Sequence, residues 1–178
     1  MTSFQPPADR IWWKVPVGKD ELLWIGIALV WCLIMFFMMP YWHVYGKQNI
    51  SSEAYQTTPA KFQASVDAFV EKYKTGEEKG IPIVSPPAGS DIYLAGRLWQ
   101  WYPILELEKG KSYRLHLSSL DWNHGFSLQP VNINLQVVPG YEMVINITPD
   151  KSGDFAVVCN EYCGIGHHTM LGKIIVKE

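Results

Sequence analysis

The strongest constraint on the fold of this chain is an apolar run at residues 22–42, which contains no charged side chain. The bilayer core offers no water to backbone N–H and C=O groups, so such a run crosses it as a helix that satisfies its own hydrogen bonds. At about 1.5 Å per residue, the run matches a hydrocarbon core of roughly 30 Å. The sequence therefore predicts one N-terminal transmembrane helix, at residues 21–45.

Aromatic residues flank the run on both sides, as in the aromatic belts of membrane spans. They are Trp12, Trp13 and Trp24 at its start and Tyr41, Trp42 and Tyr45 at its end. A cleaved signal peptide is the alternative, but the run is too long for one and no small-x-small cleavage site follows it. We interpret the run as a retained single anchor in membrane lipid.

The basic residues around the run predict its orientation. Arg10, Lys14 and Lys19 precede the run. Lys47 and Lys61 follow it. Because basic residues favour the cytoplasmic side, we expect residues 1–20 to form a short cytoplasmic segment. The chain would then be a single-pass protein of a bacterial or archaeal cell (inner) membrane, with its remaining domain periplasmic or extracellular.

Residues 46–90 are expected to form a connector with one amphipathic helix. Thr58 is a candidate N-cap, and Pro59 suits the first helical position. Apolar residues then recur at helical spacing, and the pattern ends at Gly76. These residues are Phe62, Val66, Phe69, Val70 and Tyr73. We expect the apolar face to pack on the following domain or on a neighbouring subunit.

The pattern changes to strands at residues 91–178. Short β-rich segments lie at 92–94, 104–107, 113–117, 143–147, 155–158 and 173–176. Turn signals at 109–110, 139–140 and 149–153 separate them. Because no helical pattern intervenes, the sequence predicts an all-β domain, an antiparallel sandwich or barrel.

A short segment near the C-terminus, residues 159–170, concentrates metal-binding side chains. It contains Cys159, Cys163, His167 and Met170, and His124 lies upstream on what we expect to be a separate strand. Thiolate, imidazole and thioether groups are the donors that select copper, with zinc as the main competitor. A mononuclear blue-copper site uses one cysteine. The second cysteine leaves enough ligands for two coppers.

Two other interpretations of this segment remain open. The two cysteines could form a disulfide in an oxidising compartment, but this leaves the spacing of His167 and Met170 unexplained. A structural zinc site usually takes four Cys or His ligands, and Met170 would then have no role. The third cysteine, Cys32, lies in the apolar run, where we expect it to pack as a small hydrophobe.

The pattern Cys-x-Glu-x-Cys-x-x-x-His-x-x-Met, preceded by the segment 119–124, closely resembles a known family motif. It is the binuclear copper (CuA) motif of subunit II of heme–copper oxidases. A single span resembles the B-type branch of these oxidases. The resemblance implies a cupredoxin-like Greek-key β-barrel. It also implies that Cys159 and Cys163 bridge two coppers.

The family pattern further assigns a role to each remaining ligand. His124 and Met170 would complete one copper, and His167 with the backbone carbonyl of Glu161 would complete the other. In many members the side chain at the position of Glu161 helps to bind magnesium at the boundary with subunit I. Asp121 matches the acidic residue before the ligand histidine, although a lone acid at this position could equally form a turn.

The function implied by the resemblance is that of a non-catalytic electron-transfer subunit of a cytochrome c oxidase. The copper centre would accept electrons from a c-type cytochrome or similar donor. It would pass them to hemes held in subunit I alone, where dioxygen is reduced to water and protons are translocated. The formal net charge of −2 gives no basic patch for nucleic acid.

Two other functions were weighed against this one. Some nitric oxide reductases of the same superfamily carry a CuA subunit, and the choice between the two lies in subunit I. A membrane-anchored copper chaperone also pairs two cysteines with a distant histidine. Chaperones of that kind have thioredoxin-like folds with helices between the strands, which the predicted all-β pattern does not fit.

Three tryptophans are candidates for receiving the electron from the donor. Trp99 and Trp101 lie in a segment that resembles the aromatic segment of the family, and Trp101 is the first choice. Trp122, two residues before His124, is a further candidate. The alternative is that these rings fill one end of the barrel. His116 alternates with Leu115 and Leu117, and we expect it on the solvent face.

Overall fold

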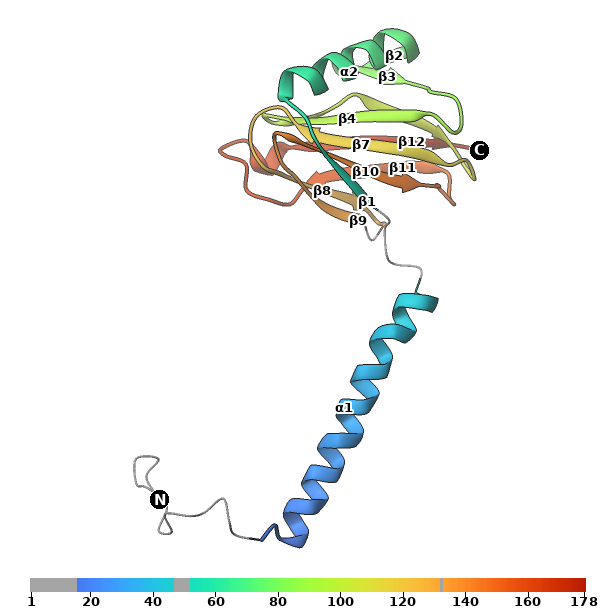
Figure 1. Cartoon of the computed structure of the whole chain (residues 1–178). Coiled ribbons are helices and arrows are strands. Elements are labelled where there is room, and N and C mark those ends of the chain that lie inside the picture. Colours follow the sequence, from blue (N-terminus) through green and yellow to red (C-terminus); the bar gives the residue numbers. More distant parts are fainter. Residues whose placement is uncertain (1–15, 47–51, 132) are drawn as a thin grey trace. The chain divides into compact units, whose positions relative to one another are not determined.

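The computed structural model describes residues 16–46, 52–131 and 133–178 (Figure 1). The chain divides into two compact units, residues 1–49 and residues 50–178. The boundaries expected from the sequence at residues 20, 45 and 90 stay a prediction about domain organisation.

The described part of the first unit is one helix, α1 (Lys19–Tyr45), with 27 residues. Its most apolar window has a mean hydropathy of 2.6, and its length and composition suffice to cross a membrane. The N–H of Gly18 donates to the Glu21 carboxylate at 2.8 Å at the start of the helix. Pro40 lies inside α1, which nevertheless continues to Tyr45. The helix supports the prediction of a single-pass membrane protein.

The residues behind the predicted orientation are mostly outside the described part of the chain. Arg10, Trp12, Trp13, Lys14 and Lys47 all fall there. The cytoplasmic placement of the N-terminus therefore stays a prediction.

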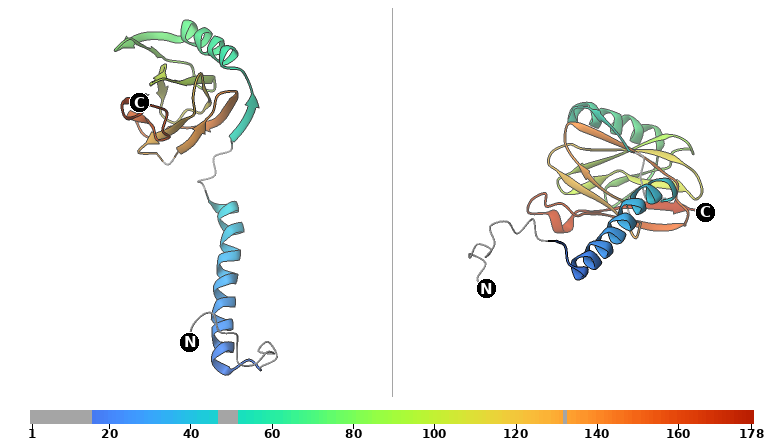
Figure 2. Two further views of the ribbon diagram at one scale, coloured as in Figure 1. Left: turned by 90° about the vertical axis from the view of Figure 1, so that its left-hand side faces the viewer. Right: turned by 60° about the horizontal axis from the view of Figure 1, so that its bottom comes forward.

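The second unit contains two β-sheets and a helix, α2 (Pro59–Tyr73) (Figures 1 and 2). The first sheet has the strand order β1 (Ser52–Gln56), β10 (Tyr141–Ile147), β7 (Tyr113–Ser119), β4 (Asp91–Arg97), β5 (Gln100–Tyr102). The second has the order β2 (Lys74–Glu78), β3 (Ile81–Val84), β6 (Ile104–Glu108), β12 (Leu171–Lys177), β11 (Gly153–Cys159), β8 (His124–Gln129), β9 (Ile133–Val137). A 3₁₀ turn, η2 (His167–Thr169), lies between β11 and β12.

The predicted all-β domain is confirmed, and each predicted β-rich segment lies in a strand. The expectation of a purely antiparallel arrangement was wrong, because β4 pairs with β7, β6 with β12 and β3 with β6 in parallel. Between the two strands of each parallel pair the chain passes through the other sheet, which allows parallel pairing without a helical crossover.

The core fills the space between the sheets. Fully buried side chains come from both sheets, and they include Ile92, Leu94, Leu115, Leu117, Leu105, Leu107, Phe126, Val157 and Ile174. Burial of one such side chain stabilises a fold by about 1.5–3 kcal/mol. At the start of β4, buried Ile92 and Leu94 alternate with the less buried Asp91 and Tyr93. This is the alternation of inward and outward faces that a strand produces.

Helix α2 covers the outer face of the first sheet. Its buried residues are Phe62, Val66, Phe69 and Val70, as the spacing predicted. The rings of Phe62 and Phe69 lie 6.0 and 5.7 Å from the ring of Tyr93 on β4. The helix ends at Tyr73 and not at Gly76, because Lys74 adopts an extended conformation and begins β2.

The segment expected as a connector contributes to both sheets. Strand β1 pairs with β10, and β3 pairs with β6. The sequence did not predict these strands, since β1 is mostly polar and β3 has only four residues, one of them Pro82.

His116 is buried, and the expectation that it faces solvent was wrong. It is 7% exposed, and its imidazole stacks on Tyr93 with the ring centres 4.7 Å apart. Its Nδ1 lies 2.5 Å from a Glu142 oxygen, and its Nε2 lies 3.2 Å from an Asp91 oxygen. Side chains from the two neighbouring strands, β4 and β10, therefore cover the ring.

We predict that Thr58→Ala lowers the free energy of unfolding of the domain by about 1 kcal/mol. The Thr58 hydroxyl accepts the N–H of Lys61 at 3.2 Å and so caps α2. Chemical denaturation monitored by circular dichroism measures the change. Thr57→Ala is the matched control, because the Thr57 hydroxyl is buried and has no hydrogen-bond partner among the described residues. Equal destabilisation by both substitutions would contradict the assignment of the cap.

Candidate metal centre

The donor segment is the loop between β11 and β12. Cys159 is the last residue of β11, and Met170 directly precedes β12. The N–H of Cys159 donates to the carbonyl of Met170 at 3.2 Å and closes the base of the loop. Gly164 has φ +110, a conformation that a residue with a side chain rarely adopts. These features turn the chain back so that donors from both ends of the loop face one another.

His124 reaches the same place from a neighbouring strand. It is the first residue of β8, which pairs with β11 so that Phe126 lies opposite Cys159. The imidazole is 0% exposed. Strand pairing thus delivers a histidine from far upstream in the sequence to the buried side of the loop, as predicted.

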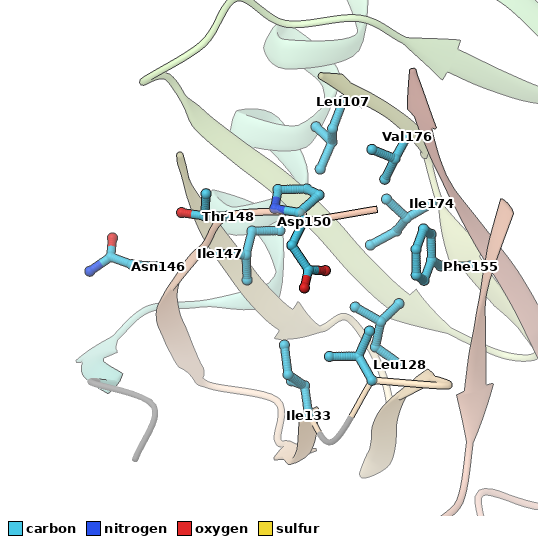
Figure 3. A pocket seen from close by; sticks show the side chains of 12 residues that line it. Leu107, Leu128, Ile133, Asn146, Ile147, Thr148, Asp150, Phe155, Ile174 and Val176 are labelled. Carbon is cyan, nitrogen blue, oxygen red and sulfur yellow. The ribbon is translucent and has the colours of Figure 1, made fainter. Parts of the chain in front are cut away.

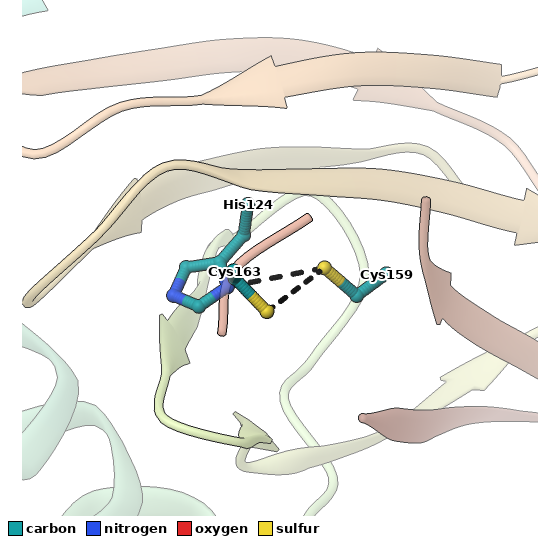
Figure 4. Close-up of side chains that lie close together, drawn as sticks. All are labelled: His124, Cys159 and Cys163. Carbon is teal, nitrogen blue, oxygen red and sulfur yellow. Dashed lines mark hydrogen bonds between the residues drawn. The ribbon is translucent and has the colours of Figure 1, made fainter. Parts of the chain in front are cut away.

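The two cysteine sulfurs form the centre of the cluster (Figure 4). Their Sγ atoms lie 3.7 Å apart, whereas a disulfide has an S–S distance of about 2.05 Å. His124 Nδ1 lies 3.9 Å from the sulfur of Cys159. Figure 4 shows the imidazole and both thiols directed toward one another, and all three residues are buried.

The remaining donors lie around the same two sulfurs. The carbonyl oxygen of Glu161 is 3.3 Å from Sγ of Cys159. His167 Nδ1 is 3.6 Å from Sγ of Cys163, and Met170 Sδ is 3.8 Å from it. The structure therefore brings together all six residues that the sequence singled out as metal ligands.

Burial changes the acid–base properties of the thiols. Burial, followed by the neighbouring Cys159, raises the pKa of Cys163 to about 11. The thiolate is the form that binds metals, so an ion that enters this cluster displaces protons from the sulfur atoms.

Asp121 connects His124 to the surrounding loops. One of its oxygens lies 2.8 Å from His124 Nε2, so that Nδ1 remains directed at the sulfur atoms. The carboxylate also accepts the N–H groups of Leu98 and Trp122, at 2.7 and 2.6 Å. Burial alone would raise the pKa of Asp121, but the hydrogen bonds from His124 and these two N–H groups lower it overall. A histidine held by a carboxylate on its second nitrogen is typical of metal sites.

The three candidate tryptophans have different environments. Trp122 is 57% exposed, Trp99 is 39% exposed and Trp101 is 1% exposed. The Nε1–H of Trp99 donates to the carbonyl of Cys163 at 3.0 Å. Its ring lies against Gly166, where an added Cβ would stand 2.3 Å from the indole. No local pattern predicts this contact, because it joins residues 64 positions apart.

Two of the remaining histidines have exposed side chains. They are His168, next to His167, and His43 on α1. The side chain of Glu161 is also exposed, although its carbonyl faces sulfur.

An apolar cavity of about 160 Å³ lies at the other end of the strands (Figure 3). Leu128, Phe155 and Ile174 line it, each toward the end of β8, β11 or β12 opposite the donor cluster. The cavity and the donor cluster share no residue.

Curated proteins similar to this chain match its C-terminal part. Cytochrome c oxidase subunit 2 of Thermus thermophilus is 38% identical over 74 residues, which are 42% of this chain and 55% of that protein. A probable cytochrome c oxidase subunit 2 of Streptomyces coelicolor is 39% identical over 74 residues, 42% of this chain and 23% of that protein. The chain therefore spans 55% or less of the length of these relatives. No family model matches the chain.

Solved structures resemble the chain in fold. A chain of a heme-copper terminal oxidase dimer has a TM-score of 0.57 at 24% identity, and the match covers 89% of this chain and 100% of that chain. Rusticyanin from Thiobacillus ferrooxidans has a TM-score of 0.50 at 18% identity, covering 72% of this chain and 100% of that chain. These likenesses confirm the cupredoxin-like fold, whereas the B-type branch stays a prediction. The sequence matches therefore show that the C-terminal part of this chain is similar to cytochrome c oxidase subunit 2 proteins, and the solved structures show the fold that it shares.

Proposed function

We propose that this chain is the CuA subunit of a respiratory cytochrome c oxidase. The observation that carries the proposal is the convergence of six donors on two sulfur atoms 3.7 Å apart. Two thiolates, two imidazoles, a thioether and a carbonyl form the set of soft and borderline donors that suits copper. Cys159 and Cys163 are the proposed bridging ligands. His124 with Met170, and His167 with the carbonyl of Glu161, complete the two metals.

When bound, a copper pair supplies one-electron redox chemistry to this buried site. The chain's own residues hold the donors in place and exclude water, because Cys159, Cys163, Met170 and His124 are each at most 4% exposed. Rigid strands and a closed loop base keep the donor positions constant. The proposed partners are a c-type cytochrome as donor and subunit I, whose hemes reduce dioxygen and which couples the reaction to proton translocation.

Trp99 is the tryptophan that the geometry favours as the first electron acceptor. It is partly exposed, and its indole N–H is hydrogen-bonded to the carbonyl of the proposed ligand Cys163. A donor protein would contact its edge without reaching the copper ligands. Trp122 is also exposed, as are Tyr162, Ile165 and Leu171 in or next to the donor loop. This apolar surface fits a donor whose docking is not dominated by charge.

Two parts of the proposal depend on residues outside the copper ligands. The exposed carboxylate of Glu161 is the proposed magnesium ligand at the boundary with subunit I. Helix α1 is the proposed membrane anchor, with the N-terminus in the cytoplasm. A thioredoxin-like copper chaperone does not fit the two-sheet fold.

We predict that the full chain, solubilised in detergent and loaded with copper, gives a seven-line electron paramagnetic resonance pattern. Seven lines arise when one unpaired electron is shared equally by two copper nuclei. Cys159→Ser and Cys163→Ser should each abolish the pattern, because each removes a proposed bridge. A four-line spectrum would point to a single copper. A silent spectrum with both cysteines oxidised would support the disulfide interpretation.

We further predict that Met170→Leu changes the copper spectrum while the fold is retained. Leucine keeps the apolar volume of this buried side chain, and such swaps usually cost less than about 1.5 kcal/mol. The thioether that lies 3.8 Å from Cys163 is lost. Met143→Leu on β10 is the matched control and should leave the spectrum unchanged. If both variants match the wild-type spectrum, Met170 is a core residue and not a ligand.

We predict that Trp99→Leu slows electron uptake by the assembled oxidase from a reduced c-type cytochrome more than Trp122→Leu does. Stopped-flow absorbance measures the rate. The copper spectrum of each variant must first match the wild type, so that a slower rate reports the loss of the ring and not damage to the metal site. A larger effect at Trp122 would move the proposed electron acceptor to that residue.

A further inference from the structure

Trp101 lies in the interior of the barrel, beneath the proposed metal site. It is the central residue of the short strand β5 and is 1% exposed. A donor protein at the surface cannot touch it, in contrast to Trp99 and Trp122. Trp101 is therefore not placed to receive an electron directly from a donor protein.

The indole of Trp101 lies against the ring of His124. The two rings meet edge to face, with centroids 6.1 Å apart at an angle of 63°. The same indole meets Phe126 edge to face, with centroids 5.7 Å apart at 84°. His124 already directs Nε2 to Asp121 and Nδ1 to the sulfur of Cys159. Trp101 therefore supplies the apolar contact on a ring whose two nitrogens are both engaged.

Two glycines provide the space for this contact. A Cβ added at Gly96 would stand 3.1 Å from Cδ2 of His124 and 3.2 Å from Cζ3 of Trp101. A Cβ added at Gly172 would stand 2.6 Å from Cβ of Trp101. Gly96 is the strand partner of Trp101 in the β4–β5 pair. The imidazole and the indole are thus closely packed at these two glycines, with no room for a side chain at either position.

The buried indole also carries a cost. Its Nε1 has no hydrogen-bond partner among the described residues. An unpaired buried donor destabilises a fold, and phenylalanine or leucine at this position would avoid that cost. The large ring is therefore present for its shape and its contact with His124, and not for a polar interaction.

We propose that Trp101 is a positioning residue for the copper ligand His124. The indole fixes the rotamer of the imidazole so that Nδ1 faces the sulfur pair, and it closes the inner side of the site to water. This inference rests on the proposed function for its link to copper. The packing itself is a property of the metal-free chain, and it can be tested separately.

The first test uses the metal-free full chain in detergent with isotope-labelled histidine. Nuclear magnetic resonance should show one set of imidazole signals for His124 in the wild type. In Trp101→Leu we expect splitting or exchange broadening of these signals, because the ring gains a second orientation. Trp101→Phe should restore part of the order, since a smaller aromatic ring remains. A single sharp set in Trp101→Leu would overturn the proposal.

Tyr113→Leu is the matched control for this test. Tyr113 is also a buried aromatic residue, 1% exposed. It lies at the start of β7, whereas the end of β7 that leads to Asp121 and Trp122 is Ser119. Tyr113 is therefore at the end of the strand far from His124. The variant should lower the stability of the domain and leave the His124 signals unchanged. If Tyr113→Leu broadens these signals as Trp101→Leu does, the effect is general loosening of the core and the proposal fails.

The second test uses copper. Trp101→Leu should retain copper about 10-fold less tightly in competition with a chelator, the lower end of the loss caused by changes around metal ligands. Gly96→Ala, which presses on the same two rings from the other side, should also change the copper hyperfine pattern. An unchanged affinity and pattern in both variants would overturn the proposal. A wild-type chain without a binuclear spectrum would instead refute the proposed function, and the metal-free test would still decide the packing of His124.

Discussion

The pairing of β8 with β11 is the interaction on which the candidate metal centre depends. It places Phe126 opposite Cys159, so that His124, two residues earlier on β8, lies beside the start of the donor loop. A shift of one residue in this register would turn His124 to the other face of the strand. Burial of Phe126 between the sheets opposes such a shift, because the shift would also turn Phe126 out of the core.

The loop between β11 and β12 also fixes the positions of the donors. Because its base is closed by the hydrogen bond between Cys159 and Met170, the four side-chain donors of the loop share a small volume before any metal binds. Burial keeps the Cys163 thiol protonated in the ordinary pH range. The protein thus fixes the positions of the donors, and a metal ion supplies the driving force for their ionisation.

Much of this arrangement could be predicted from the sequence, and the limits have physical causes. The apolar run and the cap at Thr58 are local patterns, and they predicted α1 and the start of α2 correctly. The donor spacing is also local, and the role of these residues as copper ligands stays a prediction. His116 is buried by contacts with Asp91 and Tyr93 on β4 and with Glu142 on β10. Likewise, the contact of Trp99 with Cys163 depends on the meeting of two distant turns. Such contacts leave no periodic signal in one strand.

The three tryptophans show how one residue type acquires different roles near a single site. In β5 and the turn before it, residues two apart face different surroundings, since Trp101 points into the barrel and Trp99 lies over the donor loop. Asp121 holds the N–H of Leu98 in that turn and also holds His124. The same hairpin therefore touches both segments that supply metal ligands, at Cys163 through Trp99 and at His124 through Trp101. A displacement of the hairpin would therefore disturb both segments together. The β4–β5 hairpin thus supports the candidate metal centre and also supplies the aromatic residues beside it.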